Sequence, residues 1–209
     1  MSQPRQPGFK QQVQEANMLG FGYLRRQAWT DPVAVDADRL LNDQATSDSV
    51  VTNATTFLAQ PDFARKISVT PGGTTASVPA GDVVITGTNI RGEAITDTLT
   101  FAANDTAAQI SVKAFKTVSN ILFPVQDGAG ATYDVGVTDA LGLDRCMSGN
   151  EVILVTLDGT YETTRPTVTA DADEVEKNTV DPNTALDASK DVIVAYVATE
   201  KTTKVGSTA

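Results

Sequence analysis

The feature that most constrains this chain is a run of short, Thr- and Val-rich segments with β character between Lys66 and Phe101. Within this run, residues 83–88 and 94–101 are two β-type stretches on either side of a turn that contains Asn and Gly. Two such stretches around a short turn of this composition predict a β-hairpin. The chain is therefore expected to fold around antiparallel strands.

The second stretch of the hairpin has the alternation of a half-buried strand. Its residues Ile95, Leu99 and Phe101 share one face, whereas Ala94 and the threonines share the other. Asp97 falls on the apolar side, so a bulge or a sheet edge is predicted at that position.

β-type signals continue to about Asp158 and return near the end of the chain. We expect Phe115, Ile121 and Phe123 to line one side of the segment 113–123, and Val152–Leu157 to form a central strand. The stretch 192–197 is predicted to return to the sheet as a late strand. These signals predict an all-β fold, an antiparallel β-sandwich or small barrel, with a body at 62–158 and a C-terminal segment at 159–209.

Residues 1–61 are predicted to form a long N-terminal arm with little helix. A helical turn or two is expected within 11–27 and a short helix from Asp36 to Leu41. The arm holds an unusual apolar and basic group for a solvated segment, and we predict that this group contacts a partner. The candidate partner-binding residues are Phe21, Tyr23, Leu24, Arg25, Arg26 and Trp29. The alternative is that the aromatic residues pack on the body of the same chain.

If the arm is a docking device, deleting residues 1–30 should leave a folded body. The charge is consistent with a distinct arm, because residues 1–30 hold four basic residues against one acidic residue while the whole chain carries −10. The acidic remainder disfavours contact with nucleic acid.

No segment has the roughly 18 consecutive apolar residues of a membrane helix, and the first residues lack the apolar centre of a secretion signal. We therefore expect no membrane partner and synthesis in a cytoplasm.

The chain contains no histidine, which removes the commonest general base and a frequent metal ligand. Cys146 has no imidazole to activate it as a nucleophile. The acidic stretch 171–176 is interpreted as a solvated face; calcium binding is the alternative, although the spacing of a dedicated calcium loop is missing. We predict no catalytic residue, no cofactor and no metal site.

Three segments together resemble virion structural proteins of tailed bacteriophages. They are Arg65–Thr70, Ile85–Thr96 and Lys113–Ile121. The second segment contains Thr-Gly-Thr and then Gly and Ile-Thr, and the third contains Ala-Phe-x-x-Val-x-x-Ile. The likeness covers about residues 62–145. It implies a capsid decoration (cement) protein of the virion, without catalytic residues, that binds the major capsid protein and neighbouring copies of itself, as a trimer.

Two other functions are compatible with such a chain. One is a tail, neck or host-contacting β module of the same kind of particle, which copy number in purified virions would distinguish. The other is an adhesin or carbohydrate-binding module, which glycan arrays would reveal. An enzyme is disfavoured by the missing histidine.

Overall fold

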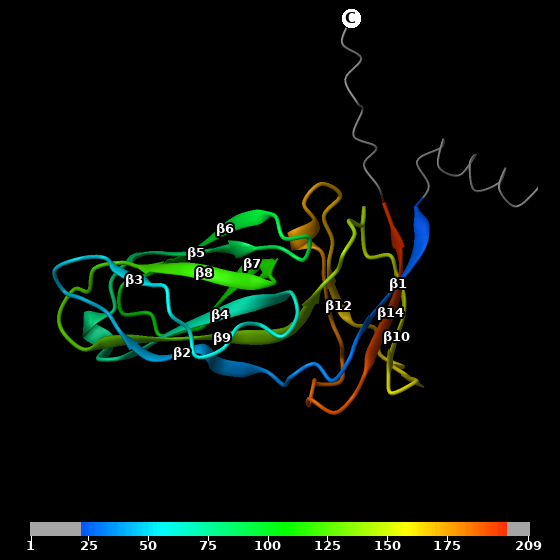
Figure 1. Ribbon diagram of the computed structural model, residues 1–209. Helices are drawn as coiled ribbons and strands as arrows, with labels where there is room; N and C mark the ends of the chain where they lie inside the picture. The colour runs from blue at the N-terminus through cyan, green and yellow to red at the C-terminus, as the bar shows by residue number, and fades with distance from the viewer. Residues whose placement is uncertain (1–21, 200–209) are drawn as a thin grey trace, which may run out of the picture.

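The structure, a computed structural model, describes residues 22–199 and is built almost entirely from antiparallel strands. The predicted all-β fold class is confirmed. The strands form two lobes that lie side by side (Figure 1). We call them the sandwich lobe and the small-sheet lobe.

The sandwich lobe consists of two facing sheets that enclose the first hydrophobic cluster. One sheet has the order β3-β8-β5-β6, and the other contains β2, β9, β4 and β7. The bounds of these strands are β2 (Asp36–Ala45), β3 (Thr52–Ala54), β4 (Arg65–Gly73), β5 (Gly81–Thr88), β6 (Ala94–Phe101), β7 (Gln109–Phe115), β8 (Thr117–Phe123) and β9 (Ala131–Gly142). A 3-10 turn, η1 (Thr75–Ser77), connects β4 to β5.

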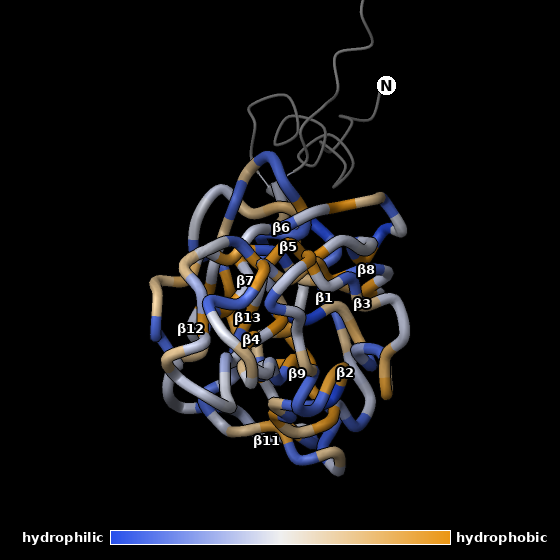
Figure 2. Tube along the Cα trace, turned by 90° about the vertical axis from the view of Figure 1, so that its left-hand side faces the viewer, coloured by the Kyte–Doolittle hydropathy of each residue, from blue (hydrophilic) through white to orange (hydrophobic). Residues whose placement is uncertain are grey.

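Alternating strand residues fill the space between these sheets. Ile95, Leu99 and Phe101 of β6 are buried as predicted. The ring of Tyr133 lies in the middle, with centroids 6.3 Å from Phe101 and 4.8 Å from Phe123. Figure 2 shows hydrophobic segments along strands in the interior and hydrophilic stretches on many connecting loops. Burial of this apolar surface is the main source of stability.

The predicted hairpin is confirmed as β5 and β6, which pair without interruption from Gly81–Phe101 to Thr88–Ala94. In its turn, the Asn89 side-chain oxygen accepts hydrogen bonds from the amides of Arg91 and Glu93. Gly92 has φ +81°, a conformation that glycine adopts without steric cost. β6 is the edge strand of its sheet, which agrees with the polar Asp97 on its inner side.

Segment 113–123 differs from the prediction, because it is two strands in two different sheets. The chain leaves β7 at Phe115 and enters β8 at Thr117, so that Lys116 marks the crossing. Phe115, Ile121 and Phe123 are nevertheless all buried in the same cluster. Periodicity showed which side chains are buried but not that they come from opposite sheets.

The small-sheet lobe has a four-stranded sheet in the order β1-β14-β10-β11. The sheet packs against the far end of the long sheet of the sandwich, where β13 and β12 extend it beyond β9. The bounds are β1 (Tyr23–Trp29), β10 (Val152–Leu157), β11 (Thr160–Tyr161), β12 (Thr167–Thr169), β13 (Thr179–Asp181) and β14 (Val192–Ala198), with a 3-10 turn η2 (Val175–Lys177) between β12 and β13. A strand forms at 192–197 as predicted, but this strand, β14, joins β1 and β10 in the small sheet and not the sheet of the hairpin; β10 has a neighbour on each side.

The expected arm requires correction. Residues 23–27, the end of the stretch in which a helical turn or two was expected, belong to β1, and the helix expected from Asp36 is instead strand β2. β1 pairs along its length with β14, β2 with β9, and β3 with β8. The described part of residues 1–61 is thus built into the sheets, because its side chains find partners there that sequence windows cannot reveal.

β9 connects the two lobes. It pairs with β4 from Ala131 to Leu141, while its other edge pairs first with β2 and then with β13. The backbone of β2 approaches so closely that a β-carbon at Gly136 would lie 1.9 Å from the carbonyl oxygen of Asp36. Only glycine permits this approach.

Arg65, at the start of β4, is fully buried between the lobes. Its Nε lies 2.9 Å from Oδ1 of Asp62, and its remaining nitrogens donate to the carbonyl oxygens of Val33 and Thr138. Burial lowers the pKa of Arg65, and the Asp62 carboxylate opposes that effect. A buried charge persists when it is paired and hydrogen-bonded in this way.

The buried position of β14 leads to a first prediction. Val194→Ala, on the inner side of β14, should lower the free energy of unfolding by about 2 kcal/mol, because it leaves a cavity in the second cluster. The adjacent Ile193→Ala, on the partly exposed outer side, should cost less than about 1 kcal/mol. Denaturant unfolding of both variants measures the difference. Equal losses would contradict the assigned orientation of β14.

Candidate interaction surface

The predicted partner-binding group lies on β1, and its side chains point to opposite faces of the small sheet. A strand alternates its side chains, so Tyr23, Arg25 and Trp29 point inward while Leu24 and Arg26 point outward. Phe21 lies outside the described residues. The structure therefore divides a group that the sequence had treated as one surface.

Trp29 is not available to a partner. It is 3% exposed and belongs to the second hydrophobic cluster, and it pairs with Val192 at the start of β14. For this residue, the alternative of packing on its own chain holds. The prediction of Trp29 as a binding residue was wrong, since the sequence does not show that a strand partner covers it.

Arg25 binds its own chain. Its guanidinium forms an ion pair with Asp144, in the β9–β10 connection, and Nε donates to Oδ1 at 3.3 Å. The same Oδ1 accepts a hydrogen bond from the Tyr196 hydroxyl at 2.7 Å. The Asp144 backbone amide donates to Gln27, and its carbonyl oxygen accepts from Arg91 of the β5–β6 turn. Asp144 thus joins β1, β14 and the sandwich lobe.

The charges of this cluster stabilise one another. Burial tends to raise the pKa of Asp144, but the hydrogen bonds from Arg25 and Tyr196 outweigh it and hold the pKa below its usual value. The contact with Asp144 raises the pKa of Arg25. Burial and the neighbouring Asp144 carboxylate raise the pKa of Tyr196. Arg25 therefore contacts its own chain, while its expected role at a partner surface stays a prediction.

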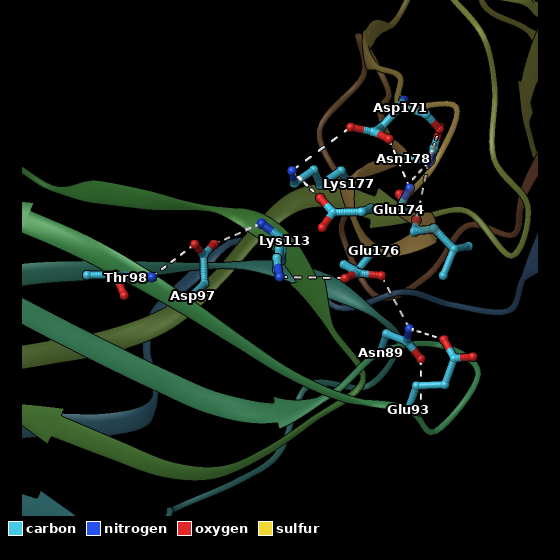
Figure 3. Close-up of polar contacts among 11 residues, drawn as sticks. Asn89, Glu93, Asp97, Thr98, Lys113, Asp171, Glu174, Glu176, Lys177 and Asn178 are labelled. Carbon is cyan, nitrogen blue, oxygen red and sulfur yellow. Dashed lines mark hydrogen bonds and ion pairs between the residues drawn. The ribbon is translucent and has the colours of Figure 1, made fainter.

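The acidic stretch 171–176 also makes contacts within the chain (Figure 3). Glu176 lies 3.6 Å from Nζ of Lys113 on β7 and accepts a hydrogen bond from Asn89 in the β5–β6 turn. Asp171 and Glu174 face Lys177 on η2. These contacts connect the two lobes and correct the view of the stretch as only a solvated face. Among the residues that the structure describes, no group of three acidic, Cys or His side chains is placed to hold a metal ion.

The outward side of the small sheet carries two of the exposed large hydrophobic residues of the described chain. Leu24 is 69% exposed and Ile153, at a bulge in β10, is 60% exposed. Their cross-strand neighbours are small or aliphatic. We call this the outer face, and it consists of Leu24, Arg26, Ala28, Ile153, Leu154, Ile193, Ala195 and Val197.

Arg26 is the single charged residue of the outer face. Within residues 22–199 its guanidinium makes no ion pair and no hydrogen bond, in contrast to Arg25. Arg26 pairs with Ala195, whose small side chain leaves the guanidinium accessible. An aliphatic surface with one unpaired arginine suits a protein partner, because arginine and buried apolar groups carry much of the energy at interfaces.

The sequence held a usable signal for this division. If Tyr23–Trp29 is read with a period of two, its residues fall into the two sets that the structure places on opposite faces, although the pattern does not show which set is buried. Asp144 had no comparable signal, because it is far from β1 in the sequence and meets Arg25 only after folding.

Comparison of the chain with protein-family models, with curated proteins and with solved structures finds no match. Among residues 22–199, no helix has the length and apolar character needed to cross a membrane.

The lowered pKa of Asp144 predicts how stability responds to pH. Because the folded-state pKa lies below the unfolded value of about 3.9, the carboxylate stabilises the fold above that pH and loses this contribution as the pH falls through the folded pKa. Asp144→Asn should lower the free energy of unfolding by about 1 kcal/mol at neutral pH. The loss is this small because solvent screens a partly exposed ion pair. The difference in the free energy of unfolding between Asp144→Asn and wild type should disappear as the pH falls below about 4.

Asp127→Asn is the matched control, since Asp127 is exposed and its carboxylate accepts no hydrogen bond within the described part of the chain. Denaturant unfolding across the pH range measures both variants. A gap between Asp144→Asn and wild type that stays constant with pH would show that the charge of Asp144 does not contribute.

Proposed function

We propose that this protein is a non-enzymatic virion structural protein of a tailed bacteriophage that binds and stabilises the assembled capsid as a decoration protein. Its partners are the major capsid protein and neighbouring copies of itself, and it resides in the virion after synthesis in the host cytoplasm. In this proposal the outer face is the attachment surface.

The observation that carries the proposal is the composition of the outer face. Exposed and half-buried aliphatic residues from three adjacent strands lie around Arg26, which has no partner in residues 22–199. A sheet face of this kind leaves apolar surface in unfavourable contact with water unless another protein covers it. The strands beneath it are held by the second hydrophobic cluster, so the surface is rigid before binding.

Two further features support the same function. The hairpin and the segments around it carry the resemblance to virion structural proteins, and they form the sandwich lobe away from the outer face. The chain is strongly acidic overall, which suits a position on the outside of a capsid, away from packaged DNA.

Capsid binding should depend on the outer face. The double variant Leu24→Asp with Arg26→Glu should bind particles that lack the protein at least about tenfold more weakly than wild type, because it places acidic groups in an apolar contact. Cosedimentation of full-length protein with purified particles measures the affinity. Point substitutions are required here, since deletion of residues 1–30 would remove β1 from the sheet.

The matched control carries the same chemical changes elsewhere. Leu58→Asp with Arg165→Glu alters two exposed residues outside the outer face and should bind like wild type. Wild-type occupancy by the outer-face variant would reject this surface as the attachment site. Failure of the wild-type protein to bind any particle would reject the decoration function itself.

The chain should also form a homo-oligomer, and the proposed state is a trimer. Sedimentation equilibrium of the purified full-length protein should then give three times the mass of the chain. A rotationally symmetric arrangement allows each copy to present the same surface to the capsid. A monomer in solution, together with single copies on the particle, would contradict the trimer.

A further inference from the structure

We infer that the end of the small-sheet lobe remote from Tyr23 carries a binding pocket for a neutral saccharide. A cavity of about 450 Å³ lies between the β10–β11 hairpin and the loop that precedes β14. Its size falls within the range of pockets for small molecules and accommodates one or two sugar rings. The inference is tested apart from the proposed capsid role, because oligosaccharide binding is measured on the purified protein.

The wall of the pocket formed by the hairpin has a defined backbone. Asp158 and Gly159 both have positive φ, 47° and 74°, as a two-residue turn between β10 and β11 requires. The amide of Asp158 donates to the carbonyl oxygen of Asp191, and the amide of Asp191 donates to the Asp158 carboxylate, each at 2.9 Å. The hairpin is therefore tied to the start of β14.

The opposite wall is held by Glu162. Its two carboxylate oxygens accept hydrogen bonds from the backbone amides of Asn183 and Thr184, at 3.1 and 2.6 Å. The amide of Glu162 in turn donates to the carbonyl oxygen of Val155. These bonds fix the loop against the sheet, so the pocket is formed before any ligand arrives.

The charged groups at the pocket are already engaged within the chain. Glu162 binds two backbone amides, Asp158 accepts from Asp191, and Lys190 forms an ion pair with Asp187. A phosphate or other anion would meet two carboxylates and a cation that is already paired. The pocket is therefore not selective for an anionic ligand.

The neutral groups, by contrast, are available. Tyr161 is 62% exposed at the pocket, and its ring presents an apolar face with a hydroxyl at its edge. Within residues 22–199, the side chains of Thr160, Thr163, Asn183 and Thr184 make no hydrogen bond. An aromatic ring beside several unengaged hydroxyls and an amide matches a sugar, which has an apolar C–H face and many hydroxyl groups.

Tyr161 pairs with Thr156, which pairs with Ile193 of the outer face, so the pocket adjoins the outer face at one end of the sheet. Tyr23 pairs with Ala198 at one end of the sheet, whereas Leu157 and Trp29 both pair with Val192 at the other end. β11 follows Leu157 and lies at the bottom of the view in Figure 2.

The test uses the full-length protein on a printed array of neutral oligosaccharides, followed by saturation-transfer NMR with the free oligosaccharide that gives the strongest array signal. Tyr161→Ala should weaken binding at least about tenfold, because it removes the stacking surface. Tyr161→Phe should weaken it less, since the ring remains and only the hydroxyl is lost. Both variants should melt like wild type, because Tyr161 is exposed.

Leu58→Ala is the matched control, because Leu58 is 72% exposed and lies after β3 in the sandwich lobe. It should bind the oligosaccharide like wild type. The inference is overturned if the folded protein binds no neutral oligosaccharide, if binding survives Tyr161→Ala, or if only anionic sugars bind. Capsid attachment is measured independently through Leu24 and Arg26, so either proposal can fail alone.

Discussion

The hydrogen bonding of β9 is the constraint on which the rest of the structure depends. One edge of this strand is paired with β4 over nearly its whole length, and the other edge is shared between β2 and β13. Its first part contributes Tyr133 and Val135 to the first hydrophobic cluster, and its last part contributes Leu141 to the second. A single continuous strand therefore fixes the orientation of two cores, neither of which could shift without breaking ladder hydrogen bonds.

Polar contacts reinforce the junction that β9 creates. Arg65 is buried where the lobes meet and is neutralised by Asp62, so its burial favours the one arrangement that supplies those partners. Nearer the surface, Glu176 joins η2 to Lys113 and Asn89, and Asp144 joins β1 to the β5–β6 turn through Arg91. Such contacts are directional, and they determine how the two lobes are oriented more than how strongly they adhere.

The small sheet uses its two faces and its two ends for different purposes. The inner face is apolar and supports the core, which is why Trp29 and Tyr196 are buried. The outer face shares the same strands but leaves Leu24 and Arg26 exposed, and the far end carries the pocket beside Tyr161. One rigid sheet thus carries both the outer face and the pocket, because both rest on strands that the core holds in place.

The sequence by itself determined the all-β class, the hairpin at 81–101 and the late strand Val192–Ala198, since each depends on local alternation and turn chemistry. It did not determine that Tyr23–Trp29 is a strand, because that segment is ordered by β14, which lies at the other end of the chain. The contact between Arg25 and Asp144 and the pocket beside Tyr161 likewise join distant segments. Only the tertiary structure decided which side of β1 is buried, because burial is a property of neighbours that sequence windows do not contain.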